Sequence, residues 1–245
     1  MNIRLFNKIS EEVFGGSRYD DVVEKYGLRV VEKYMEFGEE GDLFVDGIGR
    51  LQKILARYEL FKKIIDIPGD ICECGVFKGS GIFTWVKLMM LFKPNNQFNV
   101  IGFDLFKTKK KKLKFKYNID KKVQAWHVSG TIKESEIFKQ CNKWGFKNVK
   151  LYPGDVKITT KKYVKENFGS RISLLYLDVD NYDGTLAILN NLYHKMAKGG
   201  LIAFDEYGLK GHGESDAVDK FFKKKKIKLK SLNWANSPTS YIIKE

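Results

Sequence analysis

Four carboxylates follow two predicted strands in the segment 174–206, which reads LLYLDVDNYDGTLAILNNLYHKMAKGGLIAFDE. Asp178 and Asp180 close the first strand, and Asp205 and Glu206 close the second. If the strands are parallel neighbours, the four side chains meet at one edge of a sheet, where open α/β sheets bind their ligands. Carboxylates crowded in this way repel one another unless they hold a cation. The segment therefore predicts a metal-assisted active site.

Asp178, Asp205 and Glu206 are the candidate metal ligands, because Mg²⁺ prefers hard oxygen ligands from a few carboxylates plus water or substrate oxygens. A cation bound there would bring a substrate hydroxyl close and lower its pKa. The competing interpretation is that Asp180 or Asp183 caps the helix that begins near Gly184. We assign Asp183 to that capping role.

A glycine-containing loop, ECGVFKGSG at 73–81, follows the first strand of the predicted core. Its glycines allow a tight turn and let a ligand approach backbone amides at the next helix. Gly75 and Gly79 are four positions apart and Glu73 precedes them, so the match to the dinucleotide pattern GxGxxG is poor. The loop, which includes Ser80, looks more like one that binds S-adenosylmethionine (SAM). The alternative is an ordinary strand–helix turn that needs small residues.

Asp104 closes the second predicted strand, and a carboxylate there can accept both ribose hydroxyls of an adenosine ligand. Its alternative role is to cap the strand end. Ser129 and Asp155 fall where the following loops could reach an adenine ring, although Asp155 is equally suited to a turn. Among the histidines, we expect His194 and His127 to be structural. His212, in Gly-His-Gly after the acidic pair, is a candidate acid/base or substrate contact.

The elements that position these residues alternate between strand and helix after Pro68. We expect strands at 70–76, 99–103, 123–128, 149–152, 172–178, 201–205, 226–232 and 239–243, the last two as an antiparallel pair. Helices are expected at 81–91, 132–144, 160–168, 184–196 and 215–222. This order implies an α/β fold with a doubly wound, mostly parallel seven-stranded sheet whose C-terminal strand is antiparallel.

The first 66 residues are expected to form a helical extension, or lid, and residues 67–245 the core. Within the extension, apolar residues recur at helical spacing and predict one buried stripe. The stripe comprises Leu51, Ile54, Leu55, Tyr58, Phe61 and Ile65. Pro68-Gly69 ends the segment.

Composition limits the alternatives. The chain has 245 residues and is 43% hydrophobic, which suits a globular core. The net charge of +14 comes mainly from lysine, as in the runs 109–112 and 223–226, whereas nucleic-acid recognition favours arginine, so we expect solvated faces and consider a nucleic-acid partner unlikely. Neither a membrane span nor a secretory signal is evident, which favours the cytoplasm. Cys72, Cys74 and Cys141 lack zinc-site spacing and are expected to be buried thiols.

The chain resembles the macrocin O-methyltransferase-like family, the metal-dependent sugar O-methyltransferases of antibiotic biosynthesis. The resemblance rests on IPGDICECGVFKGSG (67–81), on 174–208 and on AVDKFF (217–222), and it covers about residues 45–225. It implies the class I SAM-dependent methyltransferase fold, with Asp178, Asp205 and Glu206 as Mg²⁺ ligands. Family members usually carry Asp at the place of Glu206. Glu73 and Asp104 would contact SAM, and Asp178 or Asp180 would receive the hydroxyl proton. A homodimer is expected only by analogy.

The sequence thus predicts a SAM- and Mg²⁺-dependent O-methyltransferase whose substrate is a nucleotide-linked or glycoconjugate sugar. Three alternatives remain open at this point. A catechol or small-phenol O-methyltransferase would use the same chemistry, and a basic nucleic-acid-binding protein could carry a methyltransferase-like core. A nicotinamide oxidoreductase is disfavoured by the poor GxGxxG match.

Overall fold

The computed structural model describes residues 47–95, 97–106, 115–122 and 132–245. Six strands form one sheet: β1 (Asp70–Cys74), β2 (Val100–Asp104), β3 (Val149–Pro153), β4 (Ile172–Leu177), β5 (Met196–Phe204) and β6 (Ser240–Ile243). The helices are α4 (Gly47–Lys63), α5 (Ser80–Phe92), α7 (Glu134–Lys143), α8 (Val156–Glu166), α9 (Tyr182–Leu192) and α10 (Glu214–Phe222). A 3₁₀ turn, η1 (Tyr193–Lys195), follows α9.

The strand order is β3-β2-β1-β4-β5-β6. The first five strands pair in parallel, and β6 pairs antiparallel with β5. The chain order reverses between β1 and β4, which places the topological switch point at the carboxyl ends of these two strands. The predicted α/β, doubly wound fold with an antiparallel C-terminal strand is confirmed.

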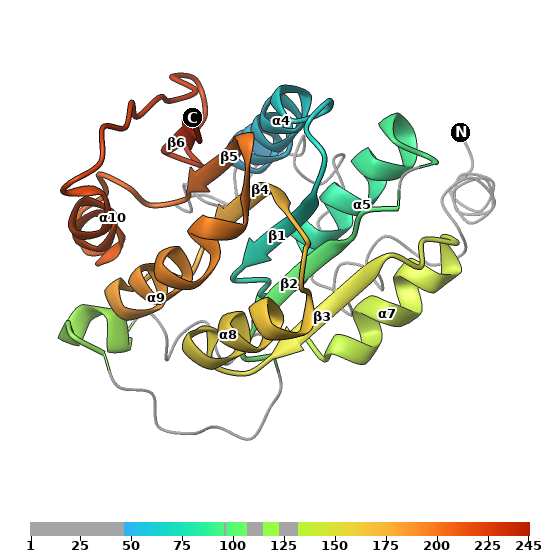
Figure 1. The fold of residues 1–245 in the computed structure, drawn as a ribbon, viewed down its shortest axis with the longest axis horizontal. Helices are drawn as coiled ribbons and strands as arrows, with labels where there is room; N and C mark the ends of the chain where they lie inside the picture. The colour runs from blue at the N-terminus through green and yellow to red at the C-terminus, as the bar shows by residue number, and fades with distance from the viewer. Residues whose placement is uncertain (1–46, 96, 107–114, 123–131) are drawn as a thin grey trace, which may run out of the picture.

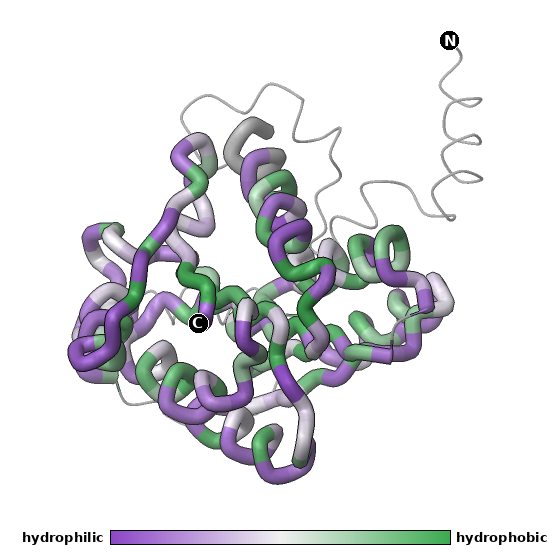
Figure 2. The backbone as a smooth tube through the Cα atoms, turned by 45° about the horizontal axis from the view of Figure 1, so that its top comes forward, coloured by the Kyte–Doolittle hydropathy of each residue, from purple (hydrophilic) through white to green (hydrophobic). Residues whose placement is uncertain are grey.

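Helices cover both faces of the sheet (Figure 1). Alternate strand residues point to opposite faces, so Ile71 and Tyr176 pack with α4, α5 and α7, whereas Cys72 and Leu175 pack with α8, α9 and α10. Figure 2 shows hydrophobic and hydrophilic residues alternating along the helices, as amphipathic helices on a sheet require. β1 and β4 are buried at every position, as strands covered on both faces are, and β4 has a nearly continuous apolar sequence.

The described sheet has six strands, whereas eight segments were predicted as strands and a seven-stranded sheet was expected. The predicted strand 226–232 contributes one antiparallel bridge, between Lys230 and Tyr241, and is otherwise irregular. Its lysines alternate with Ile227 and Leu229, which are only partly buried against the core. The predicted strand 123–128 lies outside the described residues, as do His127, the lysine run 109–112 and the first 46 residues.

The buried face of α4 differs from the predicted stripe. Phe61 is buried, as expected, but Leu55 is 45% exposed, and Ala56, Arg57, Leu60 and Ile64 face the core. A pattern based on hydrophobicity excludes a charged residue such as Arg57 from the buried face. The predicted stripe is therefore rotated around the helix relative to the observed buried face. The boundary between an extension and the core at residue 66 stays a prediction.

The three cysteines are buried and free, as predicted. Cys72 and Cys74 lie on one face of β1, in the core layer that α8 and α9 cover. Within the described part of the chain, no helix combines the length and apolar content that a membrane span requires.

Candidate active site

The carboxyl ends of β1, β4 and β5 lie side by side. The amide of Asp178 donates to the carbonyl of Cys74 at 2.8 Å, and the amide of Asp205 donates to the carbonyl of Leu177 at 3.0 Å. These bonds continue the parallel ladder one residue beyond the strands. The acidic residues after β4 and β5 are therefore held at one sheet edge by backbone pairing.

The structure brings the three predicted metal ligands together. Asp178, Asp205 and Glu206 each offer an oxygen within 4.8 Å of the other two. Asp205 and Glu206 are buried, and Asp178 is half-buried. Oδ1 of Asp205 accepts hydrogen bonds from the hydroxyls of Tyr176 and Ser237, which fixes that carboxylate.

A lysine that the sequence did not single out lies among these carboxylates. Nζ of Lys53, from α4, donates to Oδ2 of Asp178 at 3.0 Å and to Oδ2 of Asp205 at 2.9 Å. Burial and the nearby charge of Asp205 raise the pKa of Asp178 to about 6. Burial also acts to raise the pKa of Asp205, but Lys53 and the hydrogen bonds that Asp205 accepts outweigh it and lower that pKa.

Another buried carboxylate, that of Glu214, contacts the backbone of Glu206. Oε1 of Glu214, in the first turn of α10, accepts a hydrogen bond from the amide of Glu206 at 3.0 Å. Oε2 of Glu206 and Oε2 of Glu214 are both buried without a hydrogen-bond partner. Burial and the neighbouring carboxylates raise both pKa values. Sequence reasoning missed Glu214, whose only signal was an acidic residue eight positions after Glu206.

These residues fit a hard divalent cation. Every donor in the set is a carboxylate oxygen, Oε2 of Glu206 lacks a partner, and one ammonium offsets the three carboxylates. Oxygen ligands at partly hydrated sites are what Mg²⁺ prefers. The buried negative charge is costly unless a positive charge compensates it.

Asp180 and His212 form a second pair beside this cluster. Nδ1 of His212 lies 3.5 Å from Oδ1 of Asp180, and both can approach Glu206 within 4.8 Å. Asp180 has a φ of 58°, a left-handed conformation that is uncommon outside glycine. The adjacent Asp180 carboxylate raises the pKa of His212, and burial opposes the rise.

The helix cap after β4 differs from the prediction. Asn181, not Asp183, is the N-cap of α9, and its side chain accepts from the amide of Gly184 at 2.7 Å. Asp183 lies in the first turn and accepts from the amide of Lys116 at 2.6 Å. Both Asn and Asp are good N-caps, so the sequence did not settle which one occupies the position.

The glycine loop after β1 lies directly against the acidic cluster. Gly75 has a φ of 96°, and a Cβ built on it would lie 1.6 Å from the carbonyl oxygen of Asp178. Gly79 has a φ of 88° and is the N-cap of α5, where Ser80 begins the helix. Glycine is therefore required at both positions. The glycine loop and the acidic cluster therefore lie at the same edge of the sheet.

Asp104 holds the same loop from the other side. Its Oδ2 accepts from the amides of Val76 at 2.7 Å and Phe77 at 2.8 Å, and its Oδ1 accepts from the amide of Phe106 at 3.1 Å. Burial raises the pKa of Asp104, and these hydrogen bonds oppose the rise. The predicted SAM-contacting aspartate thus lies at the glycine loop.

The Glu73 side chain is buried between the first turn of α5 and helix α4. A Cβ on Gly81 would lie 1.8 Å from Oε1 of Glu73, and the same oxygen accepts from Nη2 of Arg57 at 3.0 Å. The Arg57 guanidinium also lies over the ring of Tyr176, 4.9 Å from its centroid. Burial raises the pKa of Glu73 to about 7, against the influence of Arg57. Glu73 is a buried partner of α4, and a direct SAM contact stays a prediction.

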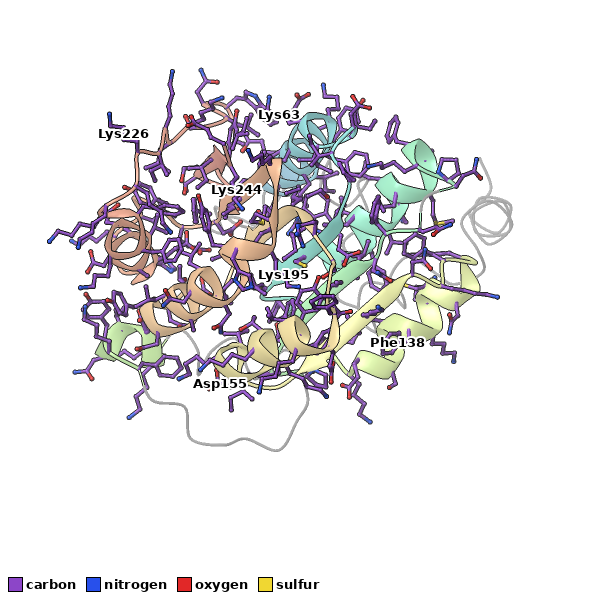
Figure 3. All side chains as sticks on the ribbon, viewed as in Figure 1. Lys63, Phe138, Asp155, Lys195, Lys226 and Lys244 are labelled. Atoms are coloured by element: carbon purple, nitrogen blue, oxygen red, sulfur yellow. The ribbon has the colours of Figure 1, made fainter. Side chains whose placement is uncertain are left out.

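Asp155 caps the helix after β3 (Figure 3). Its Oδ1 accepts from the amide of Lys157 at 2.9 Å. The turn role, which the sequence left open, is therefore the observed one, and its contact with adenine stays a prediction. Ser129 lies outside the described residues.

The family is decided by a sequence profile described as "Macrocin-O-methyltransferase (TylF)", which matches residues 46–241. The chain belongs to this family. It is an O-methyltransferase. No curated protein sequence shows a significant match to the chain.

Solved structures show the same fold. CalS11, described as a calicheamicin methyltransferase, superposes with a TM-score of 0.66 at 24% identity and 79% coverage of each chain. The O-methyltransferase NovP superposes with a TM-score of 0.64 at 21% identity and 99% coverage of each chain. An O-methyltransferase from Bacillus cereus in complex with SAH has a TM-score of 0.53 at 8% identity, covering 98% of this chain and 97% of that one.

The family match begins at residue 46 and so includes α4, the helix that carries Lys53 and Arg57. Sequence reasoning assigned this helix to a separate extension and missed both residues. The available signal was two cations four residues apart, the spacing that places side chains on one helix face.

Proposed function

We propose that the chain is a SAM- and Mg²⁺-dependent O-methyltransferase that methylates a sugar hydroxyl of a nucleotide-linked sugar or glycoconjugate. One observation carries the proposal: the glycine loop after β1 touches the backbone of Asp178, so a methyl donor on that loop would lie beside the acidic cluster. Among the similar structures, one of CalS11 is described as a TDP-rhamnose 3'-O-methyltransferase, which supports a sugar acceptor.

The donor side of the site would be formed by residues that are already fixed. Gly75 and Gly79 let a ligand approach the loop backbone, and Ser80 opens α5, whose N-terminal amides face the loop. The Asp104 carboxylate can accept ribose hydroxyls, as acids at this strand end do in related nucleotide folds. Holding donor and acceptor in a fixed orientation supplies much of the rate enhancement.

On the acceptor side, Asp178, Asp205 and Glu206 would hold Mg²⁺. When bound, the ion would act as a Lewis acid that lowers the pKa of the acceptor hydroxyl. The hydroxyl oxygen attacks the methyl carbon, the carbon–sulfur bond breaks, and the sulfonium becomes a neutral thioether. The hydroxyl proton passes to Asp178 or to the Asp180–His212 pair, whose nitrogen and oxygen lie 3.5 Å apart.

The predicted N-terminal extension would close over the acceptor and exclude water. It is described from Gly47 onward, where α4 packs on the core through Leu60 and Phe61. A homodimer remains an expectation drawn from the family.

Methyl transfer from labelled SAM to a panel of acceptors tests the proposal. The panel contains nucleotide sugars, catechol and other phenols, and short RNA and DNA. We expect labelled product with a nucleotide sugar. Product with catechol alone would transfer the assignment to a phenol O-methyltransferase. Tight, steeply salt-dependent nucleic-acid binding without SAM binding would refute the proposal.

A further inference from the structure

We propose that Lys53 is an internal counter-ion that competes with the divalent cation for Asp178 and Asp205. The inference rests on the proposed function, because it concerns the cation proposed to bind these carboxylates. It adds a residue from α4 that sets how tightly the cation is held.

The competition follows from which oxygens are already engaged. Tyr176 and Ser237 donate to Oδ1 of Asp205, which leaves Oδ2 as its less occupied oxygen. Lys53 donates to that Oδ2 at 2.9 Å and to Oδ2 of Asp178 at 3.0 Å. Its ammonium therefore bridges the two carboxylates, as a shared cation would. Two positive charges on the same pair of oxygens would repel each other.

The lysine can be displaced without unfolding its helix. α4 is fixed to the core one turn later, where Arg57 pairs with buried Glu73 at 3.0 Å and Leu60 is fully buried. The side chain of Lys53 is 21% exposed, so its ammonium group has a route to solvent. A lysine stem is flexible and can carry its charge to water while its backbone stays in place.

In the cation-free protein, Lys53 reduces the repulsion among the clustered carboxylates. Asp178, Asp205 and Glu206 lie within 4.8 Å of one another, and Glu214 contacts Glu206 from behind. One bridging ammonium lowers the repulsion between the two aspartates and keeps them in position. A divalent cation has twice the charge and can replace it. Lys53 thus stabilises the empty site and weakens cation binding.

The test compares Mn²⁺ binding by wild type, Lys53→Met and a control, using the full chain after dialysis against chelator. Methionine keeps the length of the stem and removes the charge. Lys63→Met is the matched control, because Lys63 is an exposed lysine at the end of the same helix (Figure 3). Calorimetry gives the affinity, and thermal unfolding with and without Mn²⁺ gives a second readout that needs no catalysis.

We expect Lys53→Met to bind Mn²⁺ more tightly than wild type, on the order of tenfold, because a like charge is removed from the cation's position. Without metal the variant should melt at a lower temperature than wild type, and Mn²⁺ should raise its melting temperature by more. Lys63→Met should match wild type in both measurements. If Lys53→Met does not fold, Lys53→Gln removes the charge and keeps an NH₂ group that can donate hydrogen bonds.

The outcomes separate this inference from the proposed function. Equal Mn²⁺ affinity in wild type and the Lys53 variants would overturn the competition and leave the cation site standing. Weaker binding in the variants would also overturn it and would make Lys53 a support for the cation. Binding by none of the proteins would overturn both the competition and the proposed cation role.

Discussion

The site has a donor half and an acidic half, and their buried charges are compensated differently. In the donor half, at the ends of β1 and β2, Asp104 accepts three backbone hydrogen bonds and Glu73 pairs with Arg57. In the acidic half, at the ends of β4 and β5, oxygens of Glu206 and Glu214 are buried without partners. Oε2 of Glu73 is also buried without a hydrogen-bond partner, but the Arg57 guanidinium pairs with that carboxylate, whereas the acidic half has three carboxylates around the single ammonium of Lys53 and needs further positive charge.

Helix α4 serves both halves from one face. Lys53 bridges the two aspartates of the acidic half, and Arg57, one turn later, pairs with Glu73 beneath the donor loop. Because different side chains of α4 contact the two halves, a substitution can disrupt the acidic half and leave the donor half intact. Single substitutions can therefore test whether the two halves are independent.

The largest effect is expected from Asp178→Asn. The change removes a proposed cation ligand and proton acceptor, so methyl transfer should fall about 100-fold or more. SAM binding, measured by calorimetry, should stay within about threefold of wild type, because backbone contacts with the donor loop are retained. Asp66→Asn, an exposed aspartate before β1, is the control and should leave both unchanged. Wild-type turnover in Asp178→Asn would refute its role.

Arg57→Met should cost about 3 kcal/mol of folding stability, since it leaves Glu73 buried without its charge partner. The loss should deepen as pH rises. The pKa of Glu73 is raised from 4.5 to about 7, so the stability linked to its protonated form is present below pH 4.5 and is lost as pH rises through 7. Without Arg57 the folded-state pKa rises further, and so does the loss at pH 8.

Urea unfolding at pH 5.5 and pH 8 measures this effect. Arg171→Met is the control, because Arg171 is exposed and bonds to neighbouring carbonyls, and it should change stability by less than about 0.5 kcal/mol. Adding Glu73→Gln to Arg57→Met should recover part of the stability at pH 8. A loss that is the same at both pH values would contradict the account.

Gly75→Ala tests the contact between the two halves. The added Cβ would meet the Asp178 carbonyl at 1.6 Å, and the φ of 96° is strained for alanine, so the change should destabilise the protein by about 2 kcal/mol or more. Gly145→Ala is a matched control with a φ of 76° and open space around its Cβ, and it should cost about 1 kcal/mol. Equal costs in thermal unfolding would argue against the tight contact.

The smallest effect is expected from Asp104→Asn, which weakens one set of hydrogen bonds in the donor half. SAM affinity should fall about tenfold, because a charged acceptor becomes a neutral one. Mn²⁺ affinity should not change. Asp219→Asn, an exposed aspartate on α10, is the calorimetric control. A parallel loss of Mn²⁺ binding would mean that the halves are not independent.

The sequence predicted the features that depend on local pattern. The strand–helix order, the antiparallel last strand and the four acidic residues at two strand ends all follow from periodicity and from parallel pairing. The clustering of Asp178, Asp205 and Glu206 was predictable because adjacent parallel strands end at the same edge of a sheet. The position of Asp104 beside the glycine loop was predictable for the same reason, because β1 and β2 are also adjacent parallel strands.

Side chains that cross between elements were not predictable in the same way. Lys53 and Arg57 reach the site from a helix that pattern reasoning placed outside the core, and charged residues are normally assigned to solvent. Glu214 is buried through tertiary packing of α10 against the end of β5, which no local spacing encodes. The choice of Asn181 over Asp183 as helix cap depended on a start two residues earlier than the pattern predicted, at Tyr182.

The acidic half is proposed to act on the acceptor through a divalent cation. The most direct measurement is methyl transfer from labelled SAM to a nucleotide sugar by dialysed protein, first with chelator and then with Mg²⁺ added in excess. We predict no turnover with chelator and restored turnover with Mg²⁺, while SAM binding persists in both. Undiminished turnover in the presence of chelator would contradict the claim.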